Sequence, residues 1–236
     1  GIDYARHLRG MYSIAIHDPV KNRLVLSRDP FGIKPLYYAF TQDGFVFSSE
    51  FQAFQKAKLL CPSINPEARN CLMHIQFSAG VETIMRGVYR VLPGETLVIE
   101  KAKITERIKL GALPQNAPAF IAVKDALKKL NAVLTESIGI HQRSDVPYGM
   151  FLSGGIDSSV ILTLMARLNP EPVQAYTIGF SGTGAHDERE HARALAKASG
   201  ADHHEIEYSE HEFWNTLPAI TASMDDPAAD YAVLPS

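Results

Sequence analysis

The chain has 236 residues, of which 46% are hydrophobic and 21% are charged, a composition typical of a globular protein with a sizeable core. Its length is sufficient for two ordinary domains. The formal net charge of -3 provides no general attraction to nucleic acid or to an anionic membrane, so we expect neither as a partner. The two cysteines, Cys61 and Cys71, match no metal or redox spacing, and we expect free thiols in a reducing cytoplasm.

The first half of the chain is predicted to be α+β. Alternating apolar and polar residues separated by turns predict two β-hairpins, followed by two helices and a return to strands. The predicted strands are residues 11–17, 23–27, 36–40, 45–48, 88–92 and 96–100. The stretch from Arg28 to Tyr38 is dense in turn formers and aromatic residues, and we interpret it as structural.

A linker is predicted at residues 111–118, where Gly, Pro, Gln and Asn lie close together. It separates a region 1–110 from a region 119–236. In the second region helical periodicity alternates with short apolar runs. The predicted helices are residues 119–140, 157–168, 187–199 and 209–222, and the predicted strands are 148–152, 173–178 and 202–207. This alternation specifies an α/β fold with a parallel sheet, in which the carboxyl ends of the strands meet at one edge.

The most informative stretch follows a short strand that we expect to be buried. Ser153, Gly154 and Gly155 form a turn, and Asp157 and Ser158 open an apolar-periodic helix. The glycines let backbone N–H groups approach a ligand, and the start of the helix directs its unsatisfied amides to the same place. The pattern therefore predicts an anion site. A plain strand-to-helix turn would use the same residue types.

Asp157 identifies the kind of anion. The phosphate loop of kinases and GTPases needs a lysine after its glycines, and none follows Gly155. A carboxylate beside phosphates is repulsive unless a divalent metal bridges the two, so we predict Mg²⁺ at Asp157 on the pyrophosphate portion of a nucleotide. The alternative is a helix cap or first-turn acid. At the end of the next strand, Ile178 and Gly179 could offer backbone groups and an apolar wall to adenine.

Two clusters of polar residues lie outside this loop. The first consists of His186, His191, His203 and His204, and the second of Asp225, Asp226 and Asp230. Adjacent strand residues point to opposite faces and cannot reach one ion, so we interpret the strand histidines as solvated. The acidic cluster is either a solvated turn or the lining of a ligand cleft.

Short motifs extend over nearly the whole chain. They are residues 8–12 (Leu-Arg-Gly-Met-Tyr), 28–38, 48–50 (Ser-Ser-Glu), 92–94 (Leu-Pro-Gly), and 144–149 leading into the loop at 153–159. Together they closely resemble the glutamine-hydrolysing asparagine synthetases. The resemblance implies the C-terminal part of an N-terminal-nucleophile amidotransferase domain in residues 1–110. It also implies the first part of an ATP-pyrophosphatase domain, with a Rossmann-like parallel sheet, in residues 119–236.

The resemblance also implies a function. Enzymes of this family are ligases that free ammonia from glutamine, activate aspartate as aspartyl-AMP with ATP and Mg²⁺, and release asparagine. Residues that would hold ATP are Ser153, Gly154, Gly155, Asp157 and Ser158 at the phosphates, with Mg²⁺ at Asp157, and Leu152, Ile178 and Gly179 at adenosine. Aspartate and glutamine are the expected substrates. A homodimer of the full-length enzyme is left open.

The departures from the family pattern are at the two ends. The family's N-terminal Cys nucleophile and its later Ser-Gly-Glu-Gly loop have no counterpart between Gly1 and Ser236, and neither Cys61 nor Cys71 can replace that nucleophile. We therefore expect an internal piece of a longer enzyme, with no complete catalytic set and no activity by itself. Two alternatives stay open. One is a relative that activates another carboxylate, of the β-lactam-forming or peptide-cyclising type, and the other is a non-catalytic nucleotide-binding module.

Overall fold

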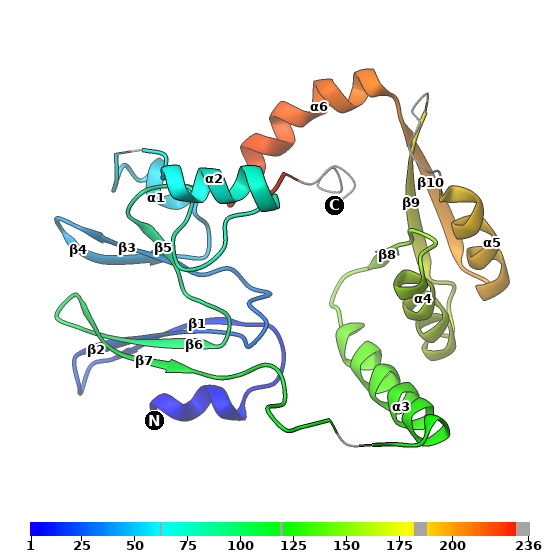
Figure 1. Ribbon diagram of the computed structural model, residues 1–236, viewed down its shortest axis with the longest axis horizontal. Coiled ribbons are helices and arrows are strands. Elements are labelled where there is room, and N and C mark those ends of the chain that lie inside the picture. The colour runs from blue at the N-terminus through cyan, green and yellow to red at the C-terminus, as the bar shows by residue number, and fades with distance from the viewer. Residues whose placement is uncertain (62, 119, 182–187, 230–236) are drawn as a thin grey trace. The chain divides into compact units, whose positions relative to one another are not determined.

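The computed structural model describes residues 1–61, 63–118, 120–181 and 188–229 (Figure 1). Among the described residues the chain divides into two compact units, one made of residues 1–116 and 219–229, and one made of residues 117–218. Each unit has hydrophobic core residues of its own. The domain boundaries predicted from the sequence, 1–110 and 119–236, stay a prediction, because this division follows contacts and not family limits.

The first unit contains two antiparallel sheets, and both predicted hairpins are confirmed. A 3₁₀ helix, Ile2–His7, precedes them. The first sheet has the order β1-β2-β6-β7 and the second the order β4-β3-β5. Their strands are β1 (Ser13–Asp18), β2 (Arg23–Arg28), β3 (Tyr37–Thr41), β4 (Gly44–Ser48), β5 (Val88–Arg90), β6 (Glu95–Glu100) and β7 (Lys103–Lys109). The sequence predicts no strand at β7, because its charged residues hide the alternation of an edge strand.

Strand β3 lies between two hydrophobic clusters. Tyr38 packs on one face with Leu26 and Leu97 of the first sheet. Tyr37, on the other face, packs with Phe54 of helix α1 (Gln52–Lys56). Because successive strand residues point to opposite faces, one strand joins the sheet-on-sheet core to the helix that covers it.

The second helix of this unit, α2 (Pro66–Ile75), has well-defined ends. Its side-chain cap is Asn65, which accepts hydrogen bonds from the backbone N–H groups of Glu67 and Ala68. Pro66 occupies the first turn, where its missing N–H costs nothing. The helix ends at Gln76, whose backbone is left-handed. Cys71 lies in this helix, and both cysteines are free.

The second unit contains the predicted parallel sheet, in the order β10-β9-β8. Its strands are β8 (Gly149–Phe151), β9 (Gln174–Phe180) and β10 (Asp202–Tyr208). The helices that follow the linker are α3 (Val123–His141), α4 (Ile156–Leu168), α5 (Arg189–Ser199) and α6 (Glu210–Ser223). Leu152, Leu162, Val173 and Ala192 form the centre of the core, which joins the sheet to α4 and α5. The division between the units falls within α6, at Pro218.

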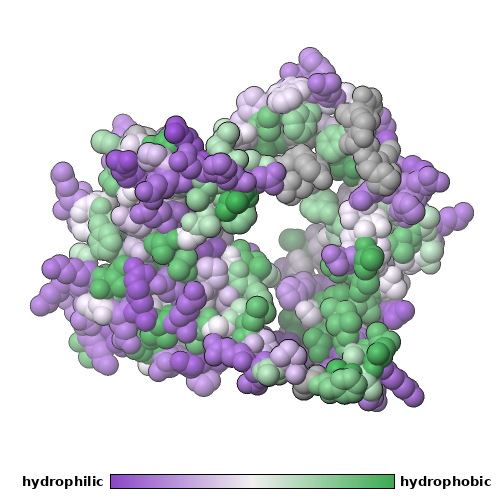
Figure 2. Space-filling model, in the orientation of Figure 1, coloured by the Kyte–Doolittle hydropathy of each residue, from purple (hydrophilic) through white to green (hydrophobic). Residues whose placement is uncertain are grey.

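Strand β8 is not buried as predicted. Phe151 is 59% exposed, because β8 pairs with β9 alone in the described part of the chain. Helix α3 likewise has no buried residue, and Leu127 and Leu130 are more than half exposed. Figure 2 shows apolar side chains at the surface over α3. None of the helices within the described ranges is long and apolar enough to cross a membrane.

Candidate functional site

The Ser-Gly-Gly turn lies at the carboxyl edge of the parallel sheet. Leu152 is 1% exposed, and its N–H donates to the carbonyl of Tyr176 at 2.8 Å. This bond extends the β8–β9 pairing by one residue and anchors the chain just before Ser153. The turn therefore begins where ligands bind in open α/β sheets.

Gly154 gives the turn its shape. Its φ is +79°, in the left-handed region that side chains disfavour. A Cβ at this position would lie 3.1 Å from the carbonyl oxygen of Glu188 and 3.1 Å from the N of Ala192. The first turn of α5 thus packs directly on the backbone of Gly154. Glycine is required here for both conformation and space.

The serines of the turn bond to its own backbone. The Ser153 hydroxyl accepts a bond from the N–H of Gly155 at 3.3 Å and lies 3.1 Å from the Ser158 hydroxyl. Ser158 and Ser159 donate to the carbonyl of Gly155 at 3.2 Å and 2.6 Å. Gly155 is the N-cap of α4 and supplies no side-chain cap. The first amides of α4 have no carbonyl partner within the helix, so they can bind an anion.

Asp157 lies in the first turn of α4 with an exposed carboxylate. Carboxylate oxygens are preferred ligands of Mg²⁺, which usually keeps several waters and binds phosphates in addition. In the ranges that the structure describes, no group of three or more His, Cys, Asp or Glu residues could hold a metal ion. An ion at Asp157 would therefore take its other ligands from water and from phosphate oxygens, which the adjacent amides also attract.

Ile178 and Gly179 lie on β9 beyond its last pair with β8, Phe151 with Tyr176, and so extend past the start of the turn. Their side-chain positions are on opposite faces of the sheet. Gly179 is buried, and a Cβ there would lie 2.2 Å from Nε of Arg189. The α5 side of Gly179 is therefore filled by Arg189, whereas Ile178, half-buried, is on the other face.

The two strand histidines have different environments. They are on opposite faces of β10, as predicted, but only His204 is solvated, with a side chain that is 45% exposed and stacked on Tyr176. The His203 side chain is 10% exposed, and its Nε2 lies 2.8 Å from the hydroxyl of Thr177. The prediction of a solvated histidine is wrong for His203, because β9 places a buried threonine beside it. His191 is exposed, and His186 lies outside the described residues.

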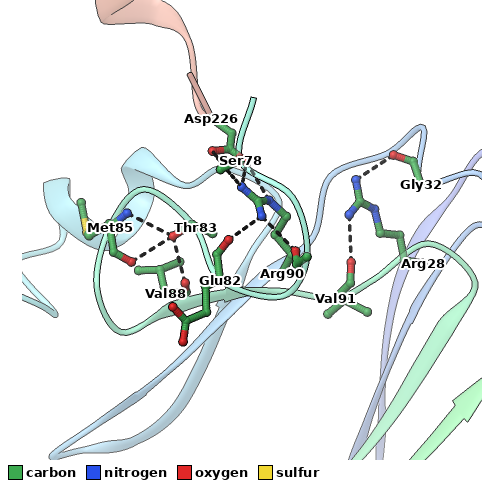
Figure 3. A network of polar contacts seen from close by, with 11 residues as sticks. Arg28, Gly32, Ser78, Glu82, Thr83, Met85, Val88, Arg90, Val91 and Asp226 are labelled. Atoms are coloured by element: carbon green, nitrogen blue, oxygen red, sulfur yellow. Dashed lines mark hydrogen bonds and ion pairs between the residues drawn. The ribbon is translucent and has the colours of Figure 1, made fainter. Parts of the chain in front are cut away.

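The acidic cluster is not a solvated turn. In the first unit Asp226 pairs with Arg90, whose Nε donates to its carboxylate at 2.7 Å and whose Nη2 contacts both Asp226 and the Ser78 hydroxyl (Figure 3). Asp225 accepts a bond from the N–H of Gln52 at 3.1 Å. Asp230 lies outside the described residues. The described residues after α6, 224–229, are therefore bound to the rest of the first unit.

Backbone contacts continue this attachment. Phe77 and Ala228 form an antiparallel bridge, and the N–H of Ala229 donates to the carbonyl of Gln76 at 2.7 Å. The nearby Tyr37 is buried, and its burial together with the charge of Asp226 raises the pKa of its hydroxyl to about 12. The segment after α6 thus contributes to the electrostatics of the first unit.

The stretch from Arg28 to Tyr38 has the structural role predicted for it. Asp29 is 1% exposed, and its carboxylate accepts hydrogen bonds from the N–H groups of Phe31, Ile33 and Lys34 at 3.1, 3.0 and 3.0 Å. Arg28 donates to three backbone carbonyls, and Figure 3 shows two of them, at Gly32 and Val91. Arg28 and Asp29 thus hold this loop in place through hydrogen bonds to backbone groups.

Near the turn, the sequence interpretation missed Thr177 and wrongly assigned His203 to solvent. Thr177 donates to the carbonyl of Leu152 at 2.7 Å. The period of two in the strands was the available signal. Thr177 places a polar side chain on the strand face that carries the buried Ala175, and His203 shares a face with Glu205. A polar group in such a position needs a partner.

Two sequence models of known families match the chain, one in each half. Residues 1–109 match the sequence model of a glutamine amidotransferase domain, and residues 129–236 match the model named asparagine synthase. The turn at 153–155 lies within the second match and the loop at Asp29 within the first.

Similar proteins cover the chain from end to end. It is 34% identical to asparagine synthetase [glutamine-hydrolyzing] 1 of Bacillus subtilis over 98% of the chain and 36% of that protein. A putative asparagine synthetase of Mycobacterium tuberculosis is 35% identical over 100% of the chain and 37% of its own length. Amidase chry2 of Gibberella zeae is 27% identical over 98% and 36%. The chain thus spans just over a third of the length of these relatives.

Proposed function

This chain belongs to the family of glutamine-hydrolysing asparagine synthetases, and on that premise we propose that it is part of an ATP-dependent amidoligase. The reaction joins ammonia derived from glutamine to the side-chain carboxylate of aspartate through aspartyl-AMP. Asparagine, AMP, pyrophosphate and glutamate are the products. The two unpaired cysteines are compatible with a reducing cytoplasm, where we place the activity.

The observation that carries the proposal is the Ser-Gly-Gly turn. Its left-handed Gly154 lies at the carboxyl edge of a parallel sheet, and the turn leads into a helix whose first amides are open to an anion. Ser153, Gly155 and Ser158 complete the proposed phosphate cradle, and Asp157 follows in the first helical turn. A phosphate-binding turn that carries an acid in place of the usual lysine supports a nucleotide bound together with Mg²⁺.

The residues of the turn act by binding and by electrostatics. Backbone amides hold the phosphates in line for attack by the aspartate carboxylate on the α-phosphorus, and they stabilise the charge that develops on the departing pyrophosphate. Leu152, Ile178 and Gly179 contact adenosine in this proposal. Mg²⁺ at Asp157 would neutralise pyrophosphate charge. No protein nucleophile is needed in this half of the reaction.

The first unit supplies the ammonia in this proposal. Its match to a glutamine amidotransferase domain supports glutamine as the nitrogen donor. Neither cysteine is assigned as the nucleophile: Cys61 is exposed and Cys71 lies on α2, and for neither do we identify a base or a terminal amine.

Asp157 provides the test, in the protein expressed from its complete gene. Asp157→Asn keeps the shape of the side chain and removes its charge, and we expect roughly a hundredfold loss or more of aspartate-dependent pyrophosphate release with Mg-ATP, as metal ligation requires. The matched control is Asp125→Asn, an exposed acid in the first turn of α3. An acid that serves the helix dipole alone is worth about 0.3–1 kcal/mol of stability and nothing in turnover.

The outcomes separate the competing assignments. Equal turnover of wild type, Asp157→Asn and Asp125→Asn would make Asp157 a first-turn acid and remove the metal role. A wild type that releases no pyrophosphate with any carboxylate would indicate a binding module. A second candidate is activation of a different carboxylate, since not every relative of this chain is named an asparagine synthetase. To identify the substrate, pyrophosphate release is measured with aspartate and with a panel of other carboxylates. The carboxylate that supports release is the substrate.

A further inference from the structure

His203 and Thr177 form a buried polar connection behind the Ser-Gly-Gly turn. Thr177 is 4% exposed and the His203 side chain 10%. The strands β9 and β10 pair Thr177 with Glu205 and Ala175 with His203, so all four residues share one face of the sheet. The Thr177 hydroxyl lies 2.7 Å from the carbonyl oxygen of Leu152 and 2.8 Å from Nε2 of His203. The connection thus ends at the residue before Ser153.

The chemistry of the three groups determines which way the hydrogen bonds run. The carbonyl of Leu152 can only accept, so the single hydroxyl proton of Thr177 is donated to it. The Thr177 oxygen then has only lone pairs for His203, whose Nε2 must carry a proton and donate. The other ring nitrogen, Nδ1, lies 3.5 Å from Oε1 of Glu205. The Thr177 hydroxyl therefore determines that Nε2 is a protonated ring nitrogen.

The outer end of the connection is also held. Arg193 of α5 binds Glu205 through two bonds, 2.8 Å from Nε to Oε1 and 2.7 Å from Nη2 to Oε2. The hydrogen bond from Arg193 keeps the pKa of the Glu205 carboxyl below its ordinary value. Ala192, the neighbour of Arg193, is the residue whose N approaches Gly154. Helix α5 therefore contacts the turn directly at Gly154 and indirectly through β10 and β9.

The peptide between Leu152 and Ser153 is planar, so the direction of the Leu152 carbonyl sets the direction of the Ser153 N–H. The structure describes no cis peptide bond, and in a trans peptide the C=O of one residue and the N–H of the next point in opposite directions. Because Thr177 holds the Leu152 carbonyl toward the buried face, the N–H of Ser153 points away from that face. Ser153 is exposed, and its amide is the first one of the turn.

We propose that Thr177 and His203 are positioning residues that aim the first backbone amide of the Ser-Gly-Gly turn at the phosphates of a bound nucleotide. The inference rests on the proposed function, since it takes the turn as the phosphate site. It adds two residues that do not touch the ligand. Their effect should be larger on phosphate binding than on adenosine binding, because the amide that they orient, that of Ser153, belongs to the turn.

The test compares paired substitutions in the protein expressed from its complete gene. Thr177→Val removes the hydroxyl at nearly constant volume and Thr177→Ser retains it, while His203→Leu removes the ring donor and His203→Gln retains an N–H donor. Thr163→Val, in α4, and His204→Leu, on the opposite face of β10, are the matched controls. Dissociation constants are measured for Mg-ATP and for adenosine.

We expect Thr177→Val to weaken Mg-ATP binding roughly tenfold, since a buried carbonyl loses its donor and the peptide can reorient. His203→Leu should weaken it in the same direction, since the Thr177 hydroxyl loses the ring donor that holds it toward Leu152. Adenosine binding should stay at the wild-type value. Thr177→Ser and His203→Gln should restore most of the Mg-ATP affinity, and the two controls should match wild type. This pattern would not arise from a general loss of stability, which would affect both ligands alike.

Three results would overturn the inference, and they can be told apart. If wild type binds Mg-ATP and both Thr177→Val and His203→Leu bind it equally well, the positioning role fails while the proposed function stands. If both ligands weaken together and the conservative variants do not recover, the connection is structural only. If wild type does not bind Mg-ATP at all, the proposed function fails and the positioning role with it.

Discussion

At the scale of single residues, Asp29 shows how one buried side chain shapes a loop. Burial alone would raise the pKa of its carboxyl, but hydrogen bonds from the backbone N–H groups of Lys34, Ile33 and Phe31 more than offset this and hold the pKa below its ordinary value. The ionised carboxylate of Asp29 is therefore more stable in the folded protein than in the unfolded chain. Asp29 contributes to stability only while it is charged.

This gives a prediction with a defined pH dependence. Asp29→Asn replaces an acceptor with a donor opposite the N–H of Lys34, and we expect the unfolding free energy at pH 7 to fall by about 1–3 kcal/mol. The folded pKa is depressed, so the advantage of wild type is complete above the unfolded pKa of about 3.9 and is lost as pH falls through the folded pKa. Calorimetry between pH 3 and pH 7 measures it.

Asp43→Asn is the control, because Asp43 is exposed in the turn between β3 and β4. The unfolding free energy of Asp43→Asn should equal that of wild type at every pH. A constant difference between wild type and Asp29→Asn down to pH 3 would show that the charge of Asp29 is not what its backbone partners stabilise.

At the scale of elements, Arg90 makes the ion pair that helps to attach residues 224–229 to the first unit. Arg90, at the end of β5, donates to the carbonyls of Gly80 and Glu82 and pairs with Asp226 (Figure 3). The Arg90 side chain is 10% exposed and that of Asp226 22%, so solvent screens this pair only in part. The guanidinium thereby joins a loop, a strand and a segment 136 residues away in sequence.

Removing the charge of Asp226 should release that segment. In Asp226→Asn a nearly buried guanidinium loses its counter-ion, and we expect about 3 kcal/mol of destabilisation of the first unit. Hydrogen exchange of the amides at 224–229 should accelerate, including that of Ala229, which bonds to Gln76. Asp225→Asn is the control, since its amide oxygen can still accept from Gln52. Unchanged exchange in Asp226→Asn would mean that the bridge at Phe77 and the bonds from Gln52 hold the segment without the ion pair.

At the scale of the whole molecule, two units with their own cores carry the two proposed half-reactions. The segment that matches a glutamine amidotransferase domain ends at residue 109, and the Ser-Gly-Gly turn lies in residues 117–218. The free amides of the turn and the loop around Asp29 belong to different sheets. A defect in the turn should therefore affect one chemical step and leave the other intact.

The prediction concerns the complete enzyme and uses both nitrogen sources. Asp157→Asn should abolish asparagine formation from glutamine and equally from free ammonia, because it acts on aspartate activation. Glutamate release from glutamine should persist, since no residue of the turn takes part in it. Asparagine formed from each nitrogen source and glutamate released from glutamine are measured under one set of conditions. Parallel loss of glutamate release would contradict the assignment of the half-reactions to separate units.

The sequence by itself determined the local elements and the position of the turn. Hairpins, helices and the parallel sheet follow from periodicity and turn residues that are close together in the chain, and the Ser-Gly-Gly-Ile-Asp order specifies a strand, a turn and a helix start. These signals are local, so one chain segment contains them entirely. The edge strand β7 was missed, because its charged residues mask its period.

Only the tertiary structure decided which polar side chains are paired. His203 meets Thr177 across 26 residues and Arg90 meets Asp226 across 136, and these contacts depend on strand register and on the path of the chain after α6. Arg189 fills the space at Gly179 for the same reason. The sequence predicts a solvated histidine or aspartate whether or not a distant part of the chain supplies a partner in the fold. Burial and pairing are properties of the folded arrangement, because they are set by neighbours that the sequence does not place side by side.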